Sequence, residues 1–191
     1  VQILDTDSGG GFARVYPSRL AGVALSGEDV RCYTLNAAGE IDRLVLQNVT
    51  GDTRPYVYLS GVEDSSSEMN TSVRYTYIQD GQTQSISGGM KYSVQAGGAM
   101  LVQEKGTLKS LRQLAPVRLD SLTALSALGD GREYPLAEEV QVLLMDDSGG
   151  RSYYPAQLSQ IDPEHYSLTG WYDDLGFSAG GRIRIIIAVP R

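Results

Sequence analysis

Hydrophobic and polar residues alternate with a period of two along most of this chain, and long segments with helical periodicity are almost absent. The final segment, "GRIRIIIAVPR", shows the pattern most clearly. One face, which we predict to be buried, carries Ile183, Ile185, Ile187 and Val189. The other face, which we predict to lie mostly in solvent, carries Arg182, Arg184 and Ile186. This alternation is typical of β-strands with one face on a core.

Short stretches rich in Gly and Asp or Asn separate these strands. They are "DSGG" (7–10), "NAAG" (36–39), "QDGQ" (79–82), "EKG" (104–106), "GDG" (129–131) and "DDSGG" (146–150). Gly and Asx residues adopt the positive φ angles that tight hairpins need. The sequence therefore predicts a series of β-hairpins.

Four segments share one plan of strand, Gly-containing turn, strand and a closing Leu-x-x-Val or Leu-x-x-Ile. They cover residues 1–23, 30–49, 99–117 and 140–161. The first and fourth segments also share "DSGG" and a later "YP". Repeated segments of this kind indicate a fold built by internal duplication.

A longer period is superimposed on the hairpins. Val30 and Val140 are 110 residues apart, and so are Val73 and Ile183. Between them, "LSG" with Gly61 corresponds to "LTG" with Gly170. We therefore expect an all-β protein with little helix, made of two tandem, internally duplicated, small antiparallel β units that are barrel- or sandwich-like. Unit boundaries are expected at residues 1–87 and 88–191.

The stretch 119–128 fits two interpretations. Its leucines recur every third residue, which suits a short helix, whereas the Asp-Gly turn that follows suits a strand entering a hairpin. The turn and the flanking alternation favour the strand.

Composition and charge narrow the class of function. The chain is 41% hydrophobic and has a formal net charge of −7, without a basic stripe that would contact phosphates. Nucleic acid is therefore not an expected partner. No apolar run approaches the roughly 18 residues of a membrane span, so direct membrane insertion is not expected. The one cysteine, Cys32, excludes an internal disulfide, and within "DVRCYTL" we predict it to be a small, buried strand residue.

No catalytic or cofactor-binding residues are predicted. The one histidine, His165, lies between "IDPE" and "YSLTG", where we expect a solvated loop residue without catalytic partners. The paired glycines match neither the dinucleotide-binding nor the P-loop pattern.

Acidic turns supply the candidate metal ligands. Asp5 and Asp7 stand two residues apart in "LDTDSGG", and Asp146 and Asp147 begin "DDSGG". Carboxylate oxygens suit Ca²⁺, although no stretch has the full calcium-loop pattern. The alternative is that these aspartates shape the turns.

Neighbouring aromatic residues are the candidate ligand-binding groups, namely Tyr153, Trp171 and Tyr172. Exposed aromatic rings can stack on sugars, which would make a carbohydrate-binding platform. The alternative is that they form cross-strand pairs on a sheet.

The stretch "YTLNAAGEIDRLVLQNVTGD", the "LSG" strand after it and the closing "GRIRIIIA" together resemble the C-terminal β-repeat region of Firmicute cell-surface proteins that carry S-layer homology domains. The resemblance implies an extracellular, cell-surface location and no particular reaction. We therefore expect a non-enzymatic structural or adhesion module whose partners are cell-wall components or other surface-protein domains. The alternatives are a carbohydrate-binding surface module and an accessory domain of a wall-active hydrolase.

Overall fold

The chain forms β-strands and short turns almost throughout, and its computed structural model describes residues 1–191. The all-β class predicted from the alternating pattern is confirmed. The strands gather into two compact units. Unit one comprises Val1–Arg54 and Asp174–Gly181, and unit two comprises Pro55–Asp173 and Arg182–Arg191.

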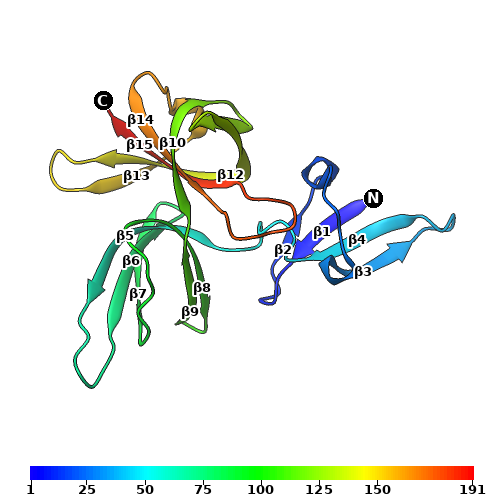
Figure 1. Ribbon diagram of the computed structural model, residues 1–191, viewed down its shortest axis with the longest axis horizontal. Coiled ribbons are helices and arrows are strands. Elements are labelled where there is room, and N and C mark those ends of the chain that lie inside the picture. Colours follow the sequence, from blue (N-terminus) through cyan, green and yellow to red (C-terminus); the bar gives the residue numbers. More distant parts are fainter. The chain divides into compact units, whose positions relative to one another are not determined.

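Unit one contains a four-stranded sheet in the order β2-β1-β4-β3, drawn in blue to cyan in Figure 1. Its elements are β1 (Gln2–Thr6), β2 (Phe12–Arg14), the 3₁₀ helices η1 (Pro17–Leu20) and η2 (Gly27–Asp29), β3 (Val30–Leu35) and β4 (Ile41–Gln47). The outer pairs are antiparallel hairpins, whereas β1 and β4 are parallel. The parallel pair is possible because the segment with η1, η2 and β3 provides the long crossover that such strands require.

A small core and an inserted loop stabilise unit one. The buried apolar residues of the core are Ile3, Val15, Leu46 and Val49. Segment 174–181 belongs to this unit because Ala179 donates its N–H to the Val49 carbonyl at 3.0 Å and Arg19 donates to the Ala179 and Gly180 carbonyls.

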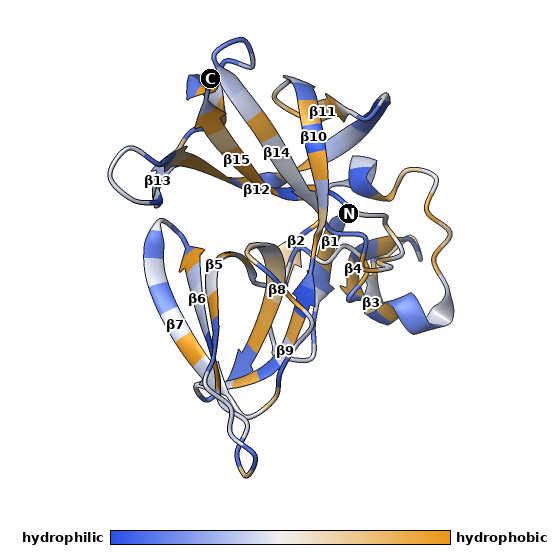
Figure 2. Cartoon of the chain, turned by 60° about the vertical axis from the view of Figure 1, so that its left-hand side comes forward, coloured by the Kyte–Doolittle hydropathy of each residue, from blue (hydrophilic) through white to orange (hydrophobic).

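Unit two begins with a five-stranded antiparallel sheet in the order β7-β6-β5-β8-β9. Its strands are β5 (Tyr56–Asp64), β6 (Val73–Gln79), β7 (Gln82–Gly88), β8 (Gly97–Glu104) and β9 (Thr107–Gln113). Tyr75, Val57, Leu59 and Leu101 are among its fully buried residues. Figure 2 shows the hydrophobic bands on these strands, with β8 coloured mostly orange.

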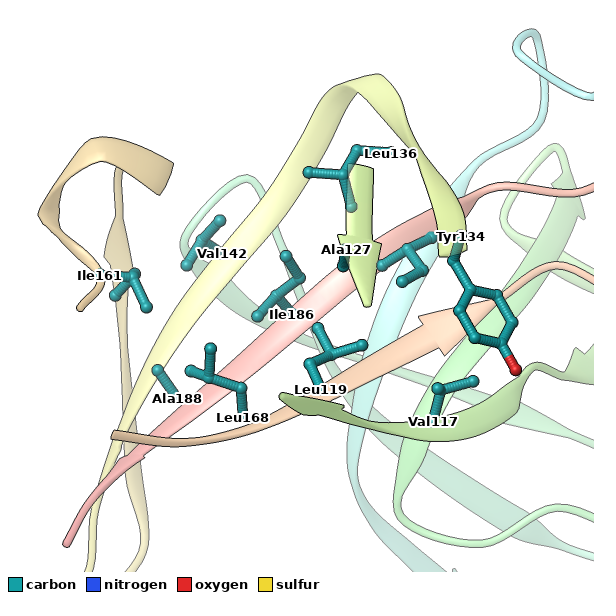
Figure 3. Packing of buried hydrophobic residues seen from close by; sticks show 11 residues of the cluster. Val117, Leu119, Ala127, Tyr134, Leu136, Val142, Ile161, Leu168, Ile186 and Ala188 are labelled. Carbon is teal, nitrogen blue, oxygen red and sulfur yellow. The ribbon is translucent and has the colours of Figure 1, made fainter. Parts of the chain in front are cut away.

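The second sheet of unit two has six strands in the order β11-β10-β14-β15-β12-β13. The strands are β10 (Ala115–Leu122), β11 (Ser126–Gly129), β12 (Arg132–Asp146), β13 (Ser152–Ala156), β14 (Tyr166–Tyr172) and β15 (Ile183–Pro190), with the 3₁₀ helix η3 (Leu158–Gln160) after β13. Because β11 also pairs with β12, the sheet closes on itself. Figure 3 shows the residues that fill it, among them Leu119, Leu136, Leu168 and Ile186.

One four-strand arrangement occurs twice in the chain. In unit two, β13-β12-β15-β14 has the same order and the same directions as β2-β1-β4-β3 in unit one, including the central parallel pair. A 3₁₀ helix follows the second strand in each case. The two copies begin with "VQIL" and "VQVL" and share "DSGG" in their first hairpin. The recurrence therefore extends from sequence to sheet topology.

The 110-residue correspondence relates β3 to β12 and β6 to β15. β12 and β15 lie side by side in one sheet, whereas β3 and β6 belong to different sheets and different units. The expected division between residues 87 and 88 falls within β7. β7 and β8 belong to one sheet, in which β6 and β5 lie between them. The compact units instead divide after Arg54 and around segment 174–181.

The predicted hairpins are present. All four repeated segments form antiparallel pairs, which are β1–β2, β3–β4, β8–β9 and β12–β13. The turns at 80–81, 105–106 and 130–131 have two consecutive positive φ angles, near +50° and +75°, as in type I′ turns. The strand interpretation of 119–128 is also confirmed, because this stretch lies in β10, β11 and the bend between them.

Two expectations about exposure are wrong. Arg184 and Ile186 are 5% and 0% exposed, although the alternation placed them in solvent, because β15 lies inside a closed sheet and both of its faces are covered. Cys32 is exposed, because β3 is an edge strand whose side chains are covered by no neighbouring strand on its outer side.

The three helical elements are single 3₁₀ turns, and none is a candidate for crossing a membrane.

Candidate functional site

The first pair of candidate calcium ligands serves the backbone of unit one. Asp5 is fully buried, and its carboxylate accepts hydrogen bonds from Val49 N at 3.1 Å and from Thr50 N and Oγ1 at 2.7 Å each. These bonds join β1 to the segment that follows β4. Asp7 Oδ1 accepts from Gly9 N at 2.8 Å and from Gly11 N at 3.2 Å, which closes the "DSGG" turn.

The second pair has the same kind of role in unit two. Asp146 Oδ1 accepts from Ser148 N at 2.9 Å, and Asp147 Oδ1 lies 3.3 Å from Arg151 Nε. No group of three or more His, Cys, Asp or Glu side chains is placed to hold a metal ion. The contacts that the four aspartates make are with backbone and side-chain groups of turns and strand ends, as in the second of the two interpretations of these residues.

Trp171 is enclosed by the protein. Trp171 is 8% exposed, and a Cβ added at Gly98 would lie 2.5 Å from the Trp171 Cβ. Gly97 lies against the six-membered part of the indole. The bare backbone of β8 thus makes room for this ring, so Trp171 packs the two sheets of unit two together and offers no exposed stacking face.

The other two candidate aromatic residues take part in ring pairs. Tyr172 lies 5.2 Å from Tyr134 between ring centroids, with the Arg132 guanidinium over both rings. Tyr153 lies 4.9 Å from Tyr58, and their hydroxyl groups are 3.4 Å apart. Tyr153 also borders a cleft.

This cleft, which we call the tyrosine cleft, lies in unit two between the β12–β13 hairpin and strands β5, β6 and β7. Its volume is about 440 Å³, and it is lined by Ser60, Ile78, Thr83, Arg151, Ser152, Tyr153 and Tyr154. Pro155 packs on Gly81 at the β6–β7 turn and so holds the hairpin against the five-stranded sheet. The sequence did not indicate this cleft, because its walls come from strands about 75 residues apart.

The chemistry of the tyrosine cleft is polar and largely uncharged. Ser60, Thr83, Ser152 and Tyr153 supply its hydroxyl groups. Burial and the hydrogen bond with Tyr153 raise the pKa of Tyr58, which contacts Tyr153 but does not line the cleft. The positive charge of Arg151 is offset by Asp147 beside it. Tyr154 is 54% exposed and presents its ring to solvent at the edge of the cleft. Hydroxyl groups beside an exposed aromatic ring suit an uncharged polar ligand.

A buried ionic network lies elsewhere in unit two. Arg184 Nε is 2.5 Å from Asp173 Oδ2, and Tyr56 donates its hydroxyl to the same oxygen at 3.1 Å. The Arg184 guanidinium also stacks on the Tyr56 ring at 4.6 Å. Burial raises the pKa of Asp173, and Arg184 opposes that shift. The network joins β5, the residue after β14, and β15. Because Asp173 and Arg184 are 0% and 5% exposed, this ion pair is closed to ligands.

The residues usually associated with nucleophilic catalysis are separate and exposed. Cys32 lies on β3 of unit one. His165 lies in the turn before β14 of unit two, with Nδ1 2.9 Å from Asp162 Oδ2 and three quarters of its side chain exposed, as expected for a solvated loop residue. The structure gives neither residue a catalytic partner set.

Comparisons of the chain with protein-family models, with curated proteins and with solved structures found no match.

Proposed function

We propose that the chain is a non-enzymatic structural or adhesion module of a bacterial surface protein. The observation that carries the proposal is the recurrence of one four-strand arrangement, β2-β1-β4-β3 and β13-β12-β15-β14. The two copies share "DSGG", which lies at the turn of a hairpin in each, and a "YP" after it, which stands at the start of η1 in unit one and in β13 in unit two. A duplication that retains turn and core residues is typical of proteins built by repeating a scaffold.

The use of the acidic residues supports the same proposal. Asp5 and Asp173 are fully buried, and each accepts several hydrogen bonds from its own unit. Catalytic carboxylates are instead expected in a cleft, within reach of a substrate. The extracellular location and the partners, cell-wall components or other surface-protein domains, rest on the sequence resemblance.

A turnover assay tests the non-enzymatic part of the proposal. The purified chain is incubated with peptidoglycan and with wall polysaccharide, and released reducing ends and soluble fragments are measured. We expect no release above a heat-denatured control. Release that one Asp or Glu substitution abolishes would contradict the proposal and favour an accessory role in a wall-active hydrolase.

A second candidate function, carbohydrate binding, is favoured by the tyrosine cleft. Its uncharged hydroxyl groups and the exposed Tyr154 ring match what a neutral saccharide requires. Binding to a glycan array is compared for the native chain and for Tyr154→Ala, with Tyr16→Ala as the control because Tyr16 is exposed in unit one. Saccharide binding that only Tyr154→Ala removes would establish this function, and no binding by the native chain would exclude it.

A further inference from the structure

We propose that the outer edge of β3 in unit one is a docking site for an extended strand of a partner polypeptide, which pairs antiparallel with β3. The proposal goes beyond a structural role, because it names a surface through which the module joins another chain. It rests on the comparison of the two four-strand arrangements.

In unit two, the strand equivalent to β3 has a neighbour on both sides. β14 pairs with β15 on one side and antiparallel with β10 on the other. In unit one, β3 pairs with β4 alone and ends the sheet. The position that β10 occupies in unit two therefore has no strand in unit one.

The strand registers identify the equivalent residues. In unit one, Arg43 lies between Thr34 and Gln2, which pair with it from either side. In unit two, Ile185 lies in the same way between Trp171 and Gln141. Thr34 is therefore equivalent to Trp171. Tyr33 is therefore equivalent to Gly170, and Cys32 to Thr169. Gly170 and Trp171 are buried, whereas Cys32, Tyr33 and Thr34 are all exposed.

The edge itself has the properties of a strand that pairs with another chain. Of the features that commonly protect exposed edges, β3 ("VRCYTL") lacks Pro and Lys; it has one charged residue, Arg31, and irregular register with β4 at Val30/Cys32 and Thr34/Leu35. Tyr33 and Leu35 are 56% and 53% exposed, so the edge combines unpaired backbone groups with apolar side chains. Backbone pairing at such an edge, with specificity from alternate side chains, is the mode of β-strand addition.

The β10–β14 pair indicates which strand fits. Val117 of β10 lies opposite Gly170, and the Leu119 side chain comes within 3.1 Å of where a Gly170 Cβ would be. Because Tyr33 replaces that glycine in unit one, the docking strand needs a small residue in place of Leu119. The partner is therefore an extended segment that alternates as β10 does but leaves room for the Tyr33 ring.

The test uses the whole chain and a synthetic peptide that reproduces residues 115–129 with the substitution Leu119→Ala. Amide hydrogen exchange and NMR shifts of the ¹⁵N-labelled chain are recorded with the peptide and with a scrambled version. We expect the first peptide alone to bind and to slow the exchange of β3 amides. Tyr33→Lys with Leu35→Lys should weaken binding by about two- to thirtyfold, from the loss of two cross-strand contacts.

Phe12→Lys is the matched control, because Phe12 is 61% exposed on β2, the opposite edge of the same sheet. Binding that Phe12→Lys leaves unchanged supports the proposal. The proposal is overturned if the peptide produces no protection, if the β3 variant binds as well as the native chain, or if β3 pairs with a second copy of the chain and excludes the peptide. The two Lys variants are compared by thermal melting, and their NMR spectra outside the substituted strand show whether each is folded.

Discussion

Asp173 Oδ2 lies 2.5 Å from Arg184 Nε, and the two residues are 0% and 5% exposed. Asp173 follows β14, and Arg184 is the second residue of β15, so this contact fixes the point where the chain leaves unit two for segment 174–181 and returns. Breaking a buried ion pair is costly because the remaining charge is left without its counter-ion.

Asp173→Asn should therefore destabilise unit two by about 3–5 kcal/mol. The measurement is urea unfolding followed by the fluorescence of Trp171, the one tryptophan, which is buried in unit two. Asp162→Asn, which alters the exposed contact with His165, should have a much smaller effect. A midpoint for Asp173→Asn equal to that of the native chain would show that the pair contributes nothing.

The aspartates should differ in pKa, with Asp64 below the ordinary value of 3.8 and Asp173 above it. The Lys91 ammonium lowers the pKa of Asp64, and backbone N–H groups lower those of Asp146 and Asp162. These groups stabilise the fold above pH 3.8, and their contribution is lost as the pH falls through the lowered values. The pKa of Asp173 is raised, so the pH dependence of stability from this group is reversed. The stability that it contributes is present at low pH and is lost as the pH rises through the raised pKa.

NMR titration of the side-chain carboxyl carbons measures these pKa values one by one. We expect midpoints below 3.8 for Asp64, Asp146 and Asp162 and a midpoint above 3.8 for Asp173. Midpoints at the ordinary value for Asp64, Asp146 and Asp162 would contradict the hydrogen bonds assigned to them.

Gly98→Ala should destabilise unit two by about 1–3 kcal/mol or more, because the new methyl group would overlap Trp171. Gly149→Ala is the control, since no atom lies within 4 Å of its Cβ position and its φ is not positive. Urea midpoints compare the two variants. Equal midpoints for Gly98→Ala and Gly149→Ala would mean that β8 does not pack on the indole.

Cys32 should react with a thiol reagent in the folded protein nearly as fast as in urea, because its side chain is exposed on the edge strand β3. Cys32→Ser should leave the melting temperature unchanged for the same reason. Slow modification that becomes fast only on unfolding would instead support the buried position that the sequence predicted.

The sequence predicted the features that depend on neighbouring residues. The turn at Asp130 and Gly131 needs two consecutive positive φ angles, and an Asp-Gly pair supplies them wherever it stands. This requirement also decided that 119–128 are strands. The positions of the hairpin turns could therefore be predicted from residue types alone.

Features that depend on distant partners were not predictable in this way. The parallel pairing of β1 with β4 is set by strands about 40 residues apart, and the burial of Arg184 depends on Asp173 and Tyr56. Alternation alone placed Arg184 in solvent, because a strand inside a closed sheet has the same period as one with a free face. The tyrosine cleft was not predictable either, because its lining residues come from strands distant in the sequence.

The most direct test of the proposed function is the position of this module on the cell that produces it. Intact cells are labelled with an antibody raised against the purified chain, before and after brief trypsin treatment, and permeabilised cells serve as the control. We predict labelling of intact cells that trypsin removes. Labelling only after permeabilisation would contradict a structural or adhesion role at the cell surface.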